Sequence, residues 1–516
     1  MARKKLTNED HYIKTGMKTR LSDKREETAS GKLAAYIINK IPEKFDIYED
    51  SDINEVHFVE AIVSVCGRYI RFCPQTGWLV YKEDEGRWTE RYAESAVTRV
   101  ITHFGYLLQE NAMKTNEGEI TFARRILSAA GIGAVKNILK HNVRIAVEQE
   151  AFDADGDKLN CMGDAYNLRT GEMRASQPED MFSKSVMCKA SELKKKDGAW
   201  EMPALPKKFE DFLNKVTSKD GQLRSDLAFY IMSYFGYCLT GDNGASFFVN
   251  FHGQGKNGKS VLLNLMMELF GDYAAPLPQD VVIENRFQGQ FDLAGLPGIR
   301  LGVLIDAPEG RLNMDMLKPI ISGDMVNAKR KYLKDFNFKP VCKIAVGSNP
   351  KLTLKDTGMA IRRRVRMVPF DYIVPDDKLV ANLHRQLIKE EAPAILALLI
   401  WFAHEYYRRG EGPRALPPCA VVDEASSEYL ASEDLVGRWI NERTEADEGS
   451  SESSADLYED FRKWAQEEGV RKVMSRNKLG EQLLTKFKKQ RFGDAYFYTG
   501  VKLKHKPQPP LESGGG

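Results

Sequence analysis

The sequence predicts an α/β protein, with a central domain of alternating strands and helices and smaller domains before and after it. Between about 243 and 372, apolar strand patterns alternate with helical ones, as strands and their crossover helices do. A glycine-rich turn in this interval, HGQGKNGKSVLLNL at 252–265, follows an apolar strand pattern and precedes an apolar helix pattern. Other helices and hairpins are predicted on both sides, so the expected fold is a central α/β core with a small α+β domain before it.

The composition is that of a large globular protein. The 516 residues are 42% hydrophobic and 29% charged, and no apolar run approaches the roughly 20 residues of a membrane span. The basic start lacks the apolar segment of a secretion signal, so we expect a cytoplasmic protein with no membrane association. The seven cysteines show no CxxC spacing and are expected to be reduced thiols. A net charge of +2 means that a nucleic-acid site must come from local clusters.

Composition shifts and punctuating glycines and prolines divide the chain into seven predicted parts. Hairpins are predicted around 83–86 and at 166–173, and two helices between 207 and 242. Polar stretches at 410–418 and 446–456 are predicted linkers. The predicted parts are a flexible arm (1–50), a small α+β domain (51–200), a helical collar (201–242), the central domain (243–412), a helix and linker (413–454), a domain of three helices and a hairpin that resembles a winged helix (455–505) and a tail that resembles a cloning scar (506–516).

The glycine-rich turn predicts a nucleotide site. Gly253, four residues, then Gly258, Lys259 and Ser260 between a strand and a helix is the pattern of a phosphate-binding P-loop. Glycines let backbone N–H groups approach phosphate oxygens, the lysine reaches the β- and γ-phosphates, and the serine hydroxyl can ligate Mg²⁺. The pattern therefore indicates ATP and Mg²⁺ as cofactors. The predicted nucleotide-binding residues are Gly253, Gly255, Asn257, Gly258, Lys259, Ser260 and Val261.

Two later strand patterns end in polar residues that could complete an ATPase centre. The run RLGVLID ends in Asp306, which we assign to the Mg²⁺ shell together with Ser260. Glu309 follows three residues later and either helps to activate water or is an exposed loop acid. The next strand pattern ends in Asn349, whose amide could orient the attacking water; the alternative is an ordinary Ser-Asn-Pro turn.

Two basic clusters accompany these strands. Arg362, Arg363 and Arg364 precede another apolar strand, and one of them is predicted to act in trans as an arginine finger, unless the three form a solvated turn. A second cluster lies at the predicted tip of a hairpin within 317–340, where positive charges flank an aromatic ring, a combination that suits single-stranded DNA. The alternative is again a solvated surface. This basic hairpin comprises Lys329, Arg330, Lys331 and Tyr332.

Taken in order, these motifs resemble a superfamily 3 helicase of the phage and plasmid primase-helicase group, which is related to the poxvirus primase-helicase. The resemblance extends over roughly 60–505 and is strongest over 235–372. It implies an AAA+ fold, a homo-hexameric ring, 3′ to 5′ movement on single-stranded DNA, and loading at forked or origin duplex DNA of a mobile element. The roles that it implies are Walker B for Asp306, sensor 1 for Asn349, the finger for Arg363 or Arg364, and a DNA-facing motif formed by Lys318 and the basic hairpin.

This chain departs from the pattern of that group at two positions. The group usually has Glu where Asp306 stands, which leaves the division of labour between Asp306 and Glu309 open. It usually has Arg where Lys329 stands, so a fork-like phosphate contact becomes a point-charge contact. No primase motif precedes residue 200, and a separate primase is therefore an expected partner.

The last folded segment is predicted to bind duplex DNA through phosphates or to dock another protein. Its expected recognition helix spans 475–487, and Lys488, Lys489 and Arg491 precede the expected wing. For the whole chain, two alternatives to a helicase share the same motifs: an ATP-switched replication initiator and a DNA-binding scaffold without processive unwinding.

Overall fold

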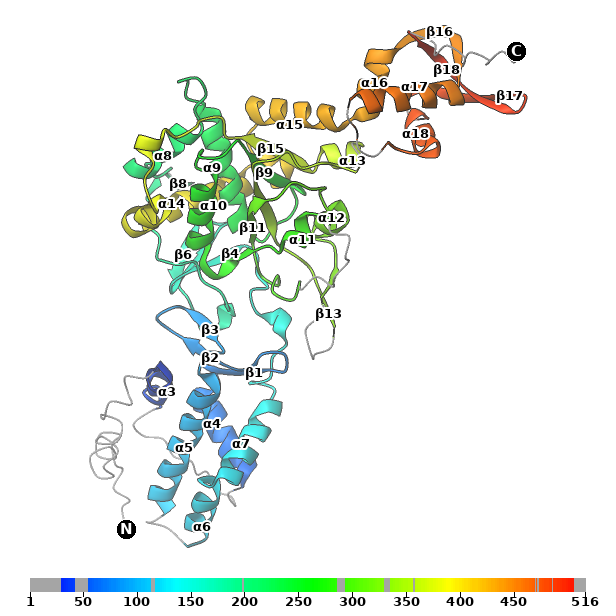
Figure 1. Ribbon diagram of the computed structural model, residues 1–516. Helices are drawn as coiled ribbons and strands as arrows, with labels where there is room; N and C mark the ends of the chain where they lie inside the picture. The colour runs from blue at the N-terminus through cyan, green and yellow to red at the C-terminus, as the bar shows by residue number, and fades with distance from the viewer. Residues whose placement is uncertain are drawn as a thin grey trace, which may run out of the picture.

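The computed structural model describes residues 29–41, 54–112, 117–196, 199–284, 293–328, 335–355, 358–468, 470, 473–484 and 486–504. Three units follow one another along an elongated molecule: a helical N-terminal unit, a central α/β unit and a small C-terminal unit (Figure 1). None of the helices in these ranges combines the length and the apolar character that a membrane span requires.

The central unit is built on a five-stranded sheet in which every neighbouring pair is parallel, in the order β10-β11-β14-β9-β15. β9 and β14 lie in the interior of this order and are buried along almost their whole length, which explains their nearly continuous apolar sequences. The predicted α/β class is confirmed, and the structure shows that the central sheet is parallel. The strands are β9 (Phe248–His252), β10 (Ala274–Pro276), β11 (Leu301–Ala307), β14 (Lys343–Ser348) and β15 (Val365–Pro369).

Successive side chains of these strands point to opposite faces, and each face has its own core. In β14, Ala345 belongs to one core, while Ile344 and Val346 belong to the other. The first core is covered by α8 (Lys207–Val216), α9 (Ser225–Leu239), α10 (Lys259–Phe270) and α14 (Leu383–Arg408). The second is covered by α11 (Gln279–Val282), α12 (Met314–Ser322) and α15 (Ala420–Glu433). Short elements complete the unit: β12 (Val326–Ala328), β13 (Phe336–Phe338), α13 (Met359–Arg362), η3 (Gly271–Tyr273), η4 (Asp376–Lys378) and η5 (Pro413–Ala415).

The N-terminal unit packs helices against a three-stranded meander. The predicted hairpin around 83–86 is present. Leu33 and Ile37 of the first helix are buried in the core of this unit, so this part of the expected flexible arm is folded. The elements are α3 (Ala29–Ile38), α4 (Glu55–Cys66), β1 (Ile70–Cys73), β2 (Gly77–Lys82), β3 (Arg87–Thr89), α5 (Ala93–Ala112), α6 (Glu117–Ile126) and α7 (Ala129–His141).

The segment 158–200 follows the N-terminal unit in sequence but packs into the central unit. It includes the predicted hairpin at 166–173. Leu159 and Trp200 are buried in the same core as the helices of the first sheet face, and the Leu168 carbonyl lies 2.9 Å from Nδ1 of His404 in α14. Its elements, with the two short turns around them, are η1 (Gln149–Ala151), β4 (Lys158–Cys161), β5 (Asp164–Asn167), β6 (Glu172–Ala175), η2 (Pro178–Asp180), β7 (Lys195–Lys196) and β8 (Ala199–Trp200).

The C-terminal unit has the order helix, strand, helix, helix, strand, strand. Its sheet has the order β16-β18-β17, and Trp439 and Trp464 lie in a core of its own. Most side chains of the edge strand β16 face solvent and are polar, and this composition is why the sequence predicted a linker over 446–456. The elements are α16 (Leu435–Arg443), β16 (Thr444–Ser453), α17 (Ser454–Glu467), α18 (Arg476–Leu483), β17 (Lys488–Phe492) and β18 (Ala495–Leu503).

The stretch 410–418 is also not a free linker. Ala415 and Leu416 are buried in the central core, and the helix that follows packs against β15. The Ser426 hydroxyl accepts a hydrogen bond of 2.9 Å from the backbone N–H of Met367. α15 is therefore part of the central unit, because its apolar face covers the sheet edge.

Candidate nucleotide site

The P-loop connects β9 to α10 in a conformation that requires glycine. Gly258 lies directly before the helix with a φ of 85°, in the left-handed region. A Cβ on Gly253 would lie 2.4 Å from the Phe370 carbonyl oxygen, so no larger residue fits there. Gly255, with a φ of 98°, completes the turn. The loop and the start of α10 thus present backbone N–H groups at a helix N-terminus, which favours anions.

Lys259, the first residue of α10, is held at the centre of the loop. Its side chain is only 3% exposed. Its Nζ donates hydrogen bonds to the Gly253 carbonyl (2.8 Å), Asn257 Oδ1 (2.9 Å) and Asn349 Oδ1 (2.9 Å). Burial lowers the pKa of Lys259 to about 8, and the nearby Asp306 carboxylate partly opposes this effect. A buried ammonium in a loop that favours anions is suited to receive phosphate oxygens.

Asn349 reaches Lys259 because of the strand order. β14 lies between β9 and β11, so the carboxyl ends of the three strands are adjacent. A Cβ on Gly347 would lie 2.2 Å from the Ile305 carbonyl oxygen, and glycine is therefore needed for this close approach. The side chain of Asn349 is exposed apart from its contact with Lys259.

The two acids lie at the end of the neighbouring strand. Asp306 is exposed near the end of β11, where the pairing with β14 shifts register between Leu304 and Ala307. Glu309 is exposed in the loop beyond the strand. Ser260 is half-buried in the first turn of α10. In the described part of the chain, no group of three or more His, Cys, Asp or Glu residues is arranged to hold a metal ion. The Ser260 hydroxyl and the Asp306 carboxylate are oxygen ligands that suit Mg²⁺. Mg²⁺ commonly takes one or two ligands from the protein and the others from phosphates and water.

A segment that the sequence reasoning missed lies along the P-loop. After β15, the Phe370 carbonyl accepts a hydrogen bond of 3.2 Å from Asn257 Nδ2, and the backbone N–H of Val374 donates to the Lys256 carbonyl at 2.8 Å. Asp376 pairs with the Lys256 ammonium at 2.6 Å. The sequence offered one signal, the acids that follow the apolar run VRMVPF.

A second missed contact comes from the helices before the sheet. The end of α8 packs against the P-loop, since a Cβ on Gly258 would lie 2.4 Å from Val216 Cγ1. Arg224 donates to the Thr217 carbonyl at 2.8 Å and pairs with Asp371 at 2.8 Å. Arg224 therefore joins the collar helices to the segment after β15.

His252, the last residue of β9, lies directly before the P-loop. Its side chain is half-buried, and burial with the neighbouring Lys259 and Lys351 lowers its pKa. Its buried Nδ1 has no hydrogen-bond partner among the described residues. The ring is therefore neutral at pH 7, and the ammonium of Lys259 supplies the positive charge at this position.

The three arginines lie at the other edge of the sheet. Arg364 directly precedes β15, and its carbonyl accepts from the backbone N–H of Phe248 at the start of β9. Because β9 and β15 are parallel, this is the amino edge, opposite the P-loop. Arg364 is buried and donates to the Ala360 carbonyl at 2.5 Å, whereas Arg363 is exposed. Arg362 lies 3.6 Å from the Asp434 carboxylate.

The predicted DNA-facing residues are placed only in part. Lys318 is exposed on α12. β12 and β13 pair as an antiparallel hairpin, with Ala328 opposite Phe336. The residues expected at its tip, Lys329, Arg330, Lys331 and Tyr332, lie outside the described residues.

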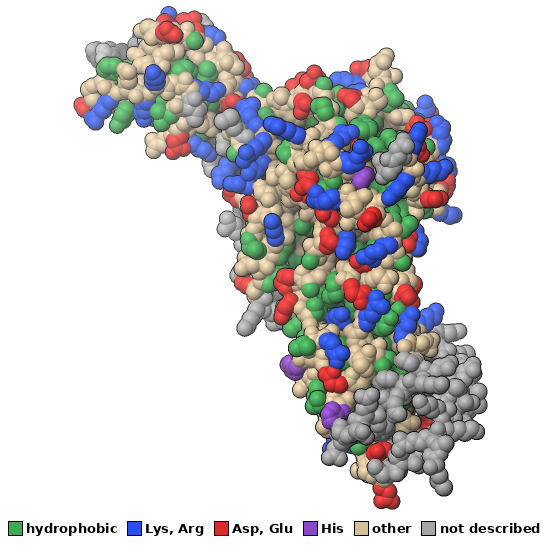
Figure 2. All heavy atoms as spheres, turned by 180° about the vertical axis from the view of Figure 1, so that it is seen from behind, with side chains coloured by type: hydrophobic (Ala, Val, Ile, Leu, Met, Phe, Trp, Pro, Cys, Tyr) green, Lys and Arg blue, Asp and Glu red, His purple; other side chains and the backbone are tan. Residues whose placement is uncertain are grey.

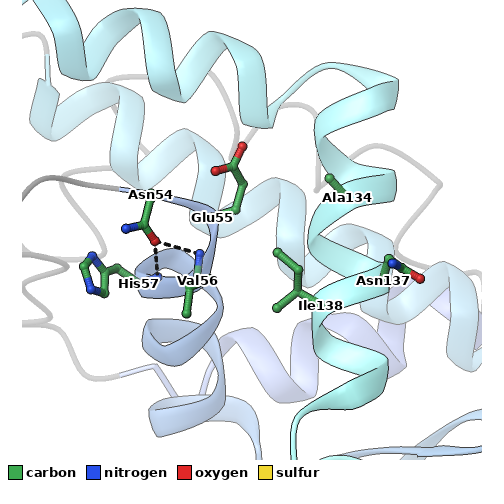
Figure 3. A pocket seen from close by; sticks show the side chains of 7 residues that line it. All are labelled: Asn54, Glu55, Val56, His57, Ala134, Asn137 and Ile138. Carbon is green, nitrogen blue, oxygen red and sulfur yellow. Dashed lines mark hydrogen bonds between the residues drawn. The ribbon is translucent and has the colours of Figure 1, made fainter.

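A hollow of about 580 Å³ lies far from the P-loop, between the start of α4 and the middle of α7 in the N-terminal unit. Figure 3 shows Asn54 accepting hydrogen bonds from the backbone N–H groups of Val56 and His57, so its side chain caps the helix. Glu55 pairs with Arg125. Two of the polar side chains at this hollow, Asn54 and Glu55, are therefore used by the fold.

Two family models match separate parts of the chain, and the first extends from the N-terminal unit into the central unit as far as α8. Residues 59–218 match a family model described as D5 N terminal like. Residues 251–364, which begin directly before the P-loop, match a family of unknown function, DUF5906.

Two viral relatives are similar over longer stretches. A protein of Acanthamoeba polyphaga mimivirus named "putative helicase" is 24% identical over 355 residues, which are 64% of this chain and 34% of that protein. A protein of Frog virus 3 (isolate Goorha) with the same description is 26% identical over 235 residues, which are 41% of this chain and 23% of that protein. This chain contains a D5 N-terminal-like segment and is a relative of viral proteins named as putative helicases. The predicted resemblance to the primase-helicase group is thereby confirmed.

The chain matches about a third or less of the length of those two viral proteins. Among solved structures, the A-form apo structure of the NrS-1 C-terminal region has a TM-score of 0.43 and 11% identity, and the match covers 76% of this chain and 80% of that one. A second apo structure of the same region has a TM-score of 0.41 and 11% identity, covering 72% and 90% of the two chains.

Proposed function

We propose that this protein is an ATP-dependent DNA helicase that acts in the replication of a virus, phage or other mobile element. The observation that carries the proposal is the cluster at the carboxyl edge of the sheet, where the Lys259 ammonium lies 2.9 Å from Asn349 Oδ1 and beside the Asp306 carboxylate. These groups come from three adjacent strands or their loops. The viral relatives named as helicases support unwinding as the use of the energy.

Each residue at this edge has a chemical task in the proposed reaction. When bound, ATP with Mg²⁺ supplies the phosphoryl group that is transferred to water. Lys259 would exchange its amide and carbonyl partners for phosphate oxygens, and Ser260 and Asp306 would hold the metal. Asn349 is released by the same exchange, and its amide is then free to orient water. Glu309 lies in the adjacent loop and is the candidate for polarising that water.

We propose that the finger is Arg363 and that it acts on a neighbouring copy. The amino edge of the sheet, where it lies, is opposite the P-loop of the same chain, so Arg363 can reach phosphates only across an interface. Arg364 is buried and donates a hydrogen bond to the Ala360 carbonyl, which argues for a structural role. Completion of the site by a second copy supports an AAA+ ring, with a hexamer as the expected closed form.

The DNA contacts are proposed for two places. Lys318 and the 329–332 hairpin would face the ring channel and hold single-stranded DNA. The order of elements in the C-terminal unit, with three helices and a β17–β18 hairpin, supports a winged-helix domain. Its helix α18 would contact duplex phosphates at a fork or origin, and a separate primase would supply priming.

Unwinding of a forked DNA substrate tests the proposal against a switch-like initiator. We expect ATP-dependent strand release by the full chain and none by Lys259→Ala. ATP hydrolysis without strand release on forks of either polarity would favour the initiator. Tests of the C-terminal unit should remove residues after 434, since removal after Pro413 also deletes α15 and exposes the sheet face under Tyr429 and Leu430.

A further inference from the structure

The hairpin formed by β17 and β18 extends beyond the core of the C-terminal unit (Figure 1). All five residues of β17, the edge strand, are exposed. The turn that joins the strands contains Gly493 with a φ of 58°, which suits a tight hairpin turn. The Gly493 carbonyl accepts a hydrogen bond of 3.1 Å from Arg491 Nε. The hairpin end is thus a defined structure with no other element folded over it in the described chain.

Two large aromatic rings stand at this end without contributing to a core. Phe492 is 56% exposed and Tyr496 is 46% exposed. Neither belongs to the hydrophobic core of the C-terminal unit, which instead holds Tyr498, two residues further along β18. Exposed apolar side chains that lie close together mark interaction sites more often than single exposed ones do. Phe492 contacts the Phe497 ring edge to face, with ring centroids 5.7 Å apart, but both Phe492 and Tyr496 keep about half of their surface open to solvent.

Two cations lie over the Tyr496 ring. The Lys489 ammonium lies 4.2 Å from the centroid of the Tyr496 ring, and the Arg491 guanidinium lies 5.9 Å from it. Lys488 is exposed in the same strand, and the only acid in the turn is Asp494, 3.8 Å from Arg491. Figure 2 shows basic and acidic side chains beside hydrophobic ones at the outer end of the C-terminal unit. The hairpin end is net positive and aromatic.

We propose that this hairpin end binds the unpaired strand of a DNA fork, with bases stacking on Phe492 and Tyr496 and phosphates held by Lys489 and Arg491. This proposal depends on the proposed function only because it assumes that the bound polymer is DNA. Stacking on aromatic rings within a positive surface is the general way in which proteins hold single strands. A continuous duplex offers phosphates alone, because its bases are already stacked, and would leave both rings unused.

The first test maps the contact in the full chain without nucleotide. A fork is prepared with 5-iododeoxyuridine at single positions of its unpaired arms and is irradiated, so that a ring stacked on the modified base forms a covalent bond. We expect crosslinked peptides that contain Phe492 or Tyr496, and fewer of them when the modified base lies inside the duplex. The absence of any crosslink within 488–497 would overturn the proposal.

The second test measures affinity for the same fork by fluorescence anisotropy. We expect Phe492→Ala with Tyr496→Ala to weaken binding by about tenfold or more, and Tyr496→Phe, which keeps the ring, to retain most of the affinity. Tyr92→Ala is the matched control, since Tyr92 is also 46% exposed and has the Arg91 guanidinium 5.1 Å from its ring, but lies in the N-terminal unit. Equal losses for Tyr92→Ala and the double variant would overturn the proposal, as would a loss confined to blunt duplex.

These tests are independent of ATP hydrolysis. If Lys259→Ala kept its ATP hydrolysis, the proposed helicase function would be refuted. The crosslink positions and the measured affinities would still test the hairpin proposal. Unchanged thermal unfolding of the double variant confirms that a loss of affinity is not a loss of folding.

Discussion

Two buried lysines lie at opposite ends of the strands of the central sheet, one at the carboxyl end and one at the amino end. The two lysines differ in their hydrogen-bond partners. Lys259 at the carboxyl edge is 3% exposed and Lys343 at the amino edge is 2% exposed. Burial lowers the pKa of each to about 8. Lys343 donates to the Thr240 and Val341 carbonyls and lies 5.1 Å from the Tyr237 ring centroid, so it holds the carboxyl end of α9.

Lys259, by contrast, is held partly by side chains that can move. Two of its three acceptors are the amide oxygens of Asn257 and Asn349, and the Asp306 carboxylate is near. Fixed carbonyl partners indicate a structural lysine, whereas exchangeable partners at a loop that favours anions indicate a binding lysine. Burial and a lowered pKa alone do not distinguish the two.

The largest expected effect comes from removing the binding lysine. Lys259→Ala should lower ATP hydrolysis by at least about 100-fold, because Lys259 is the buried cation at the centre of the loop, whereas the exposed Lys256 is paired with Asp376. Thermal stability should change little, since the loss of packing is offset by the removal of a buried charge. Phosphate release measured at saturating ATP gives the first quantity. Turnover close to that of the unchanged chain would refute the P-loop assignment.

Asn349→Ala should have the next largest effect, lowering the turnover number by about 100-fold while nucleotide binding remains. The reason is that the amide acts on water, whereas binding comes from the loop and Lys259. The measurement is the turnover number together with the affinity for a fluorescent ATP analogue. Asn327→Ala is the control, because Asn327 is also exposed but bonds only across the β12–β13 hairpin, at 2.9 Å to Asn337. Equal turnover in the two variants would show that Asn349 is only a turn residue.

The structural lysine should show the opposite behaviour. Lys343→Ala leaves a cavity and two buried carbonyls without their donor, and should lower the free energy of unfolding by about 2–4 kcal/mol. Lys343→Met restores the volume and should cost less. Chemical denaturation measures both. If either variant lost nucleotide binding while remaining fully folded, the distinction between the two lysines would be wrong.

The smallest expected effect is a pH dependence that only the binding lysine shows. Phosphates favour the protonated form of Lys259, so the affinity for ATP should be full below its pKa of about 8 and fall above it, by up to about tenfold per pH unit. Isothermal titration from pH 7 to 9.5 measures this. Lys343→Met should retain the fall. An affinity that stays constant over this range would show that Lys259 keeps an ordinary pKa.

Both lysines also give stability a pH dependence of known sign. Each has a lowered pKa in the folded protein, so each costs stability while protonated, below about pH 8. The cost is relieved between about pH 8 and the ordinary lysine pKa of about 10.4, because the unfolded chain binds more protons there.

The sequence was sufficient where function depends on consecutive residues. Glycines at 253, 255 and 258 and the lysine after them predict a loop that the structure contains, and the strand that ends in Asn349 could be located by its apolar pattern. The alternation of strands and helices was likewise sufficient to predict an α/β core.

The rest depends on which distant segments pack together. Arg364 lies at the amino end of the strands because β15 pairs in parallel with β9. The contact between Asn257 and the Phe370 carbonyl depends on the path of the chain after β15. Polar composition misled at 446–456, because an edge strand of a small sheet needs few apolar residues. Pairing and packing of this kind are not encoded in a local pattern.

The packing of 158–200 into the central unit bears on how the chain can be divided. Trp200 lies against His404 with ring centroids 5.0 Å apart, and the Trp401 indole donates to the Trp200 carbonyl at 3.1 Å. A fragment that begins at residue 201 would leave this surface of α14 open to water. Cleavage around 149–156 would keep every layer over the central sheet but would cut the chain between the β1–β3 meander and residues that bury it. Trp88 Nε1 donates to the Pro178 carbonyl at 3.0 Å, and the Trp88 backbone N–H donates to the Phe182 carbonyl at 2.7 Å. The two polypeptides should therefore stay associated after such a cleavage and should need to be produced together to remain soluble.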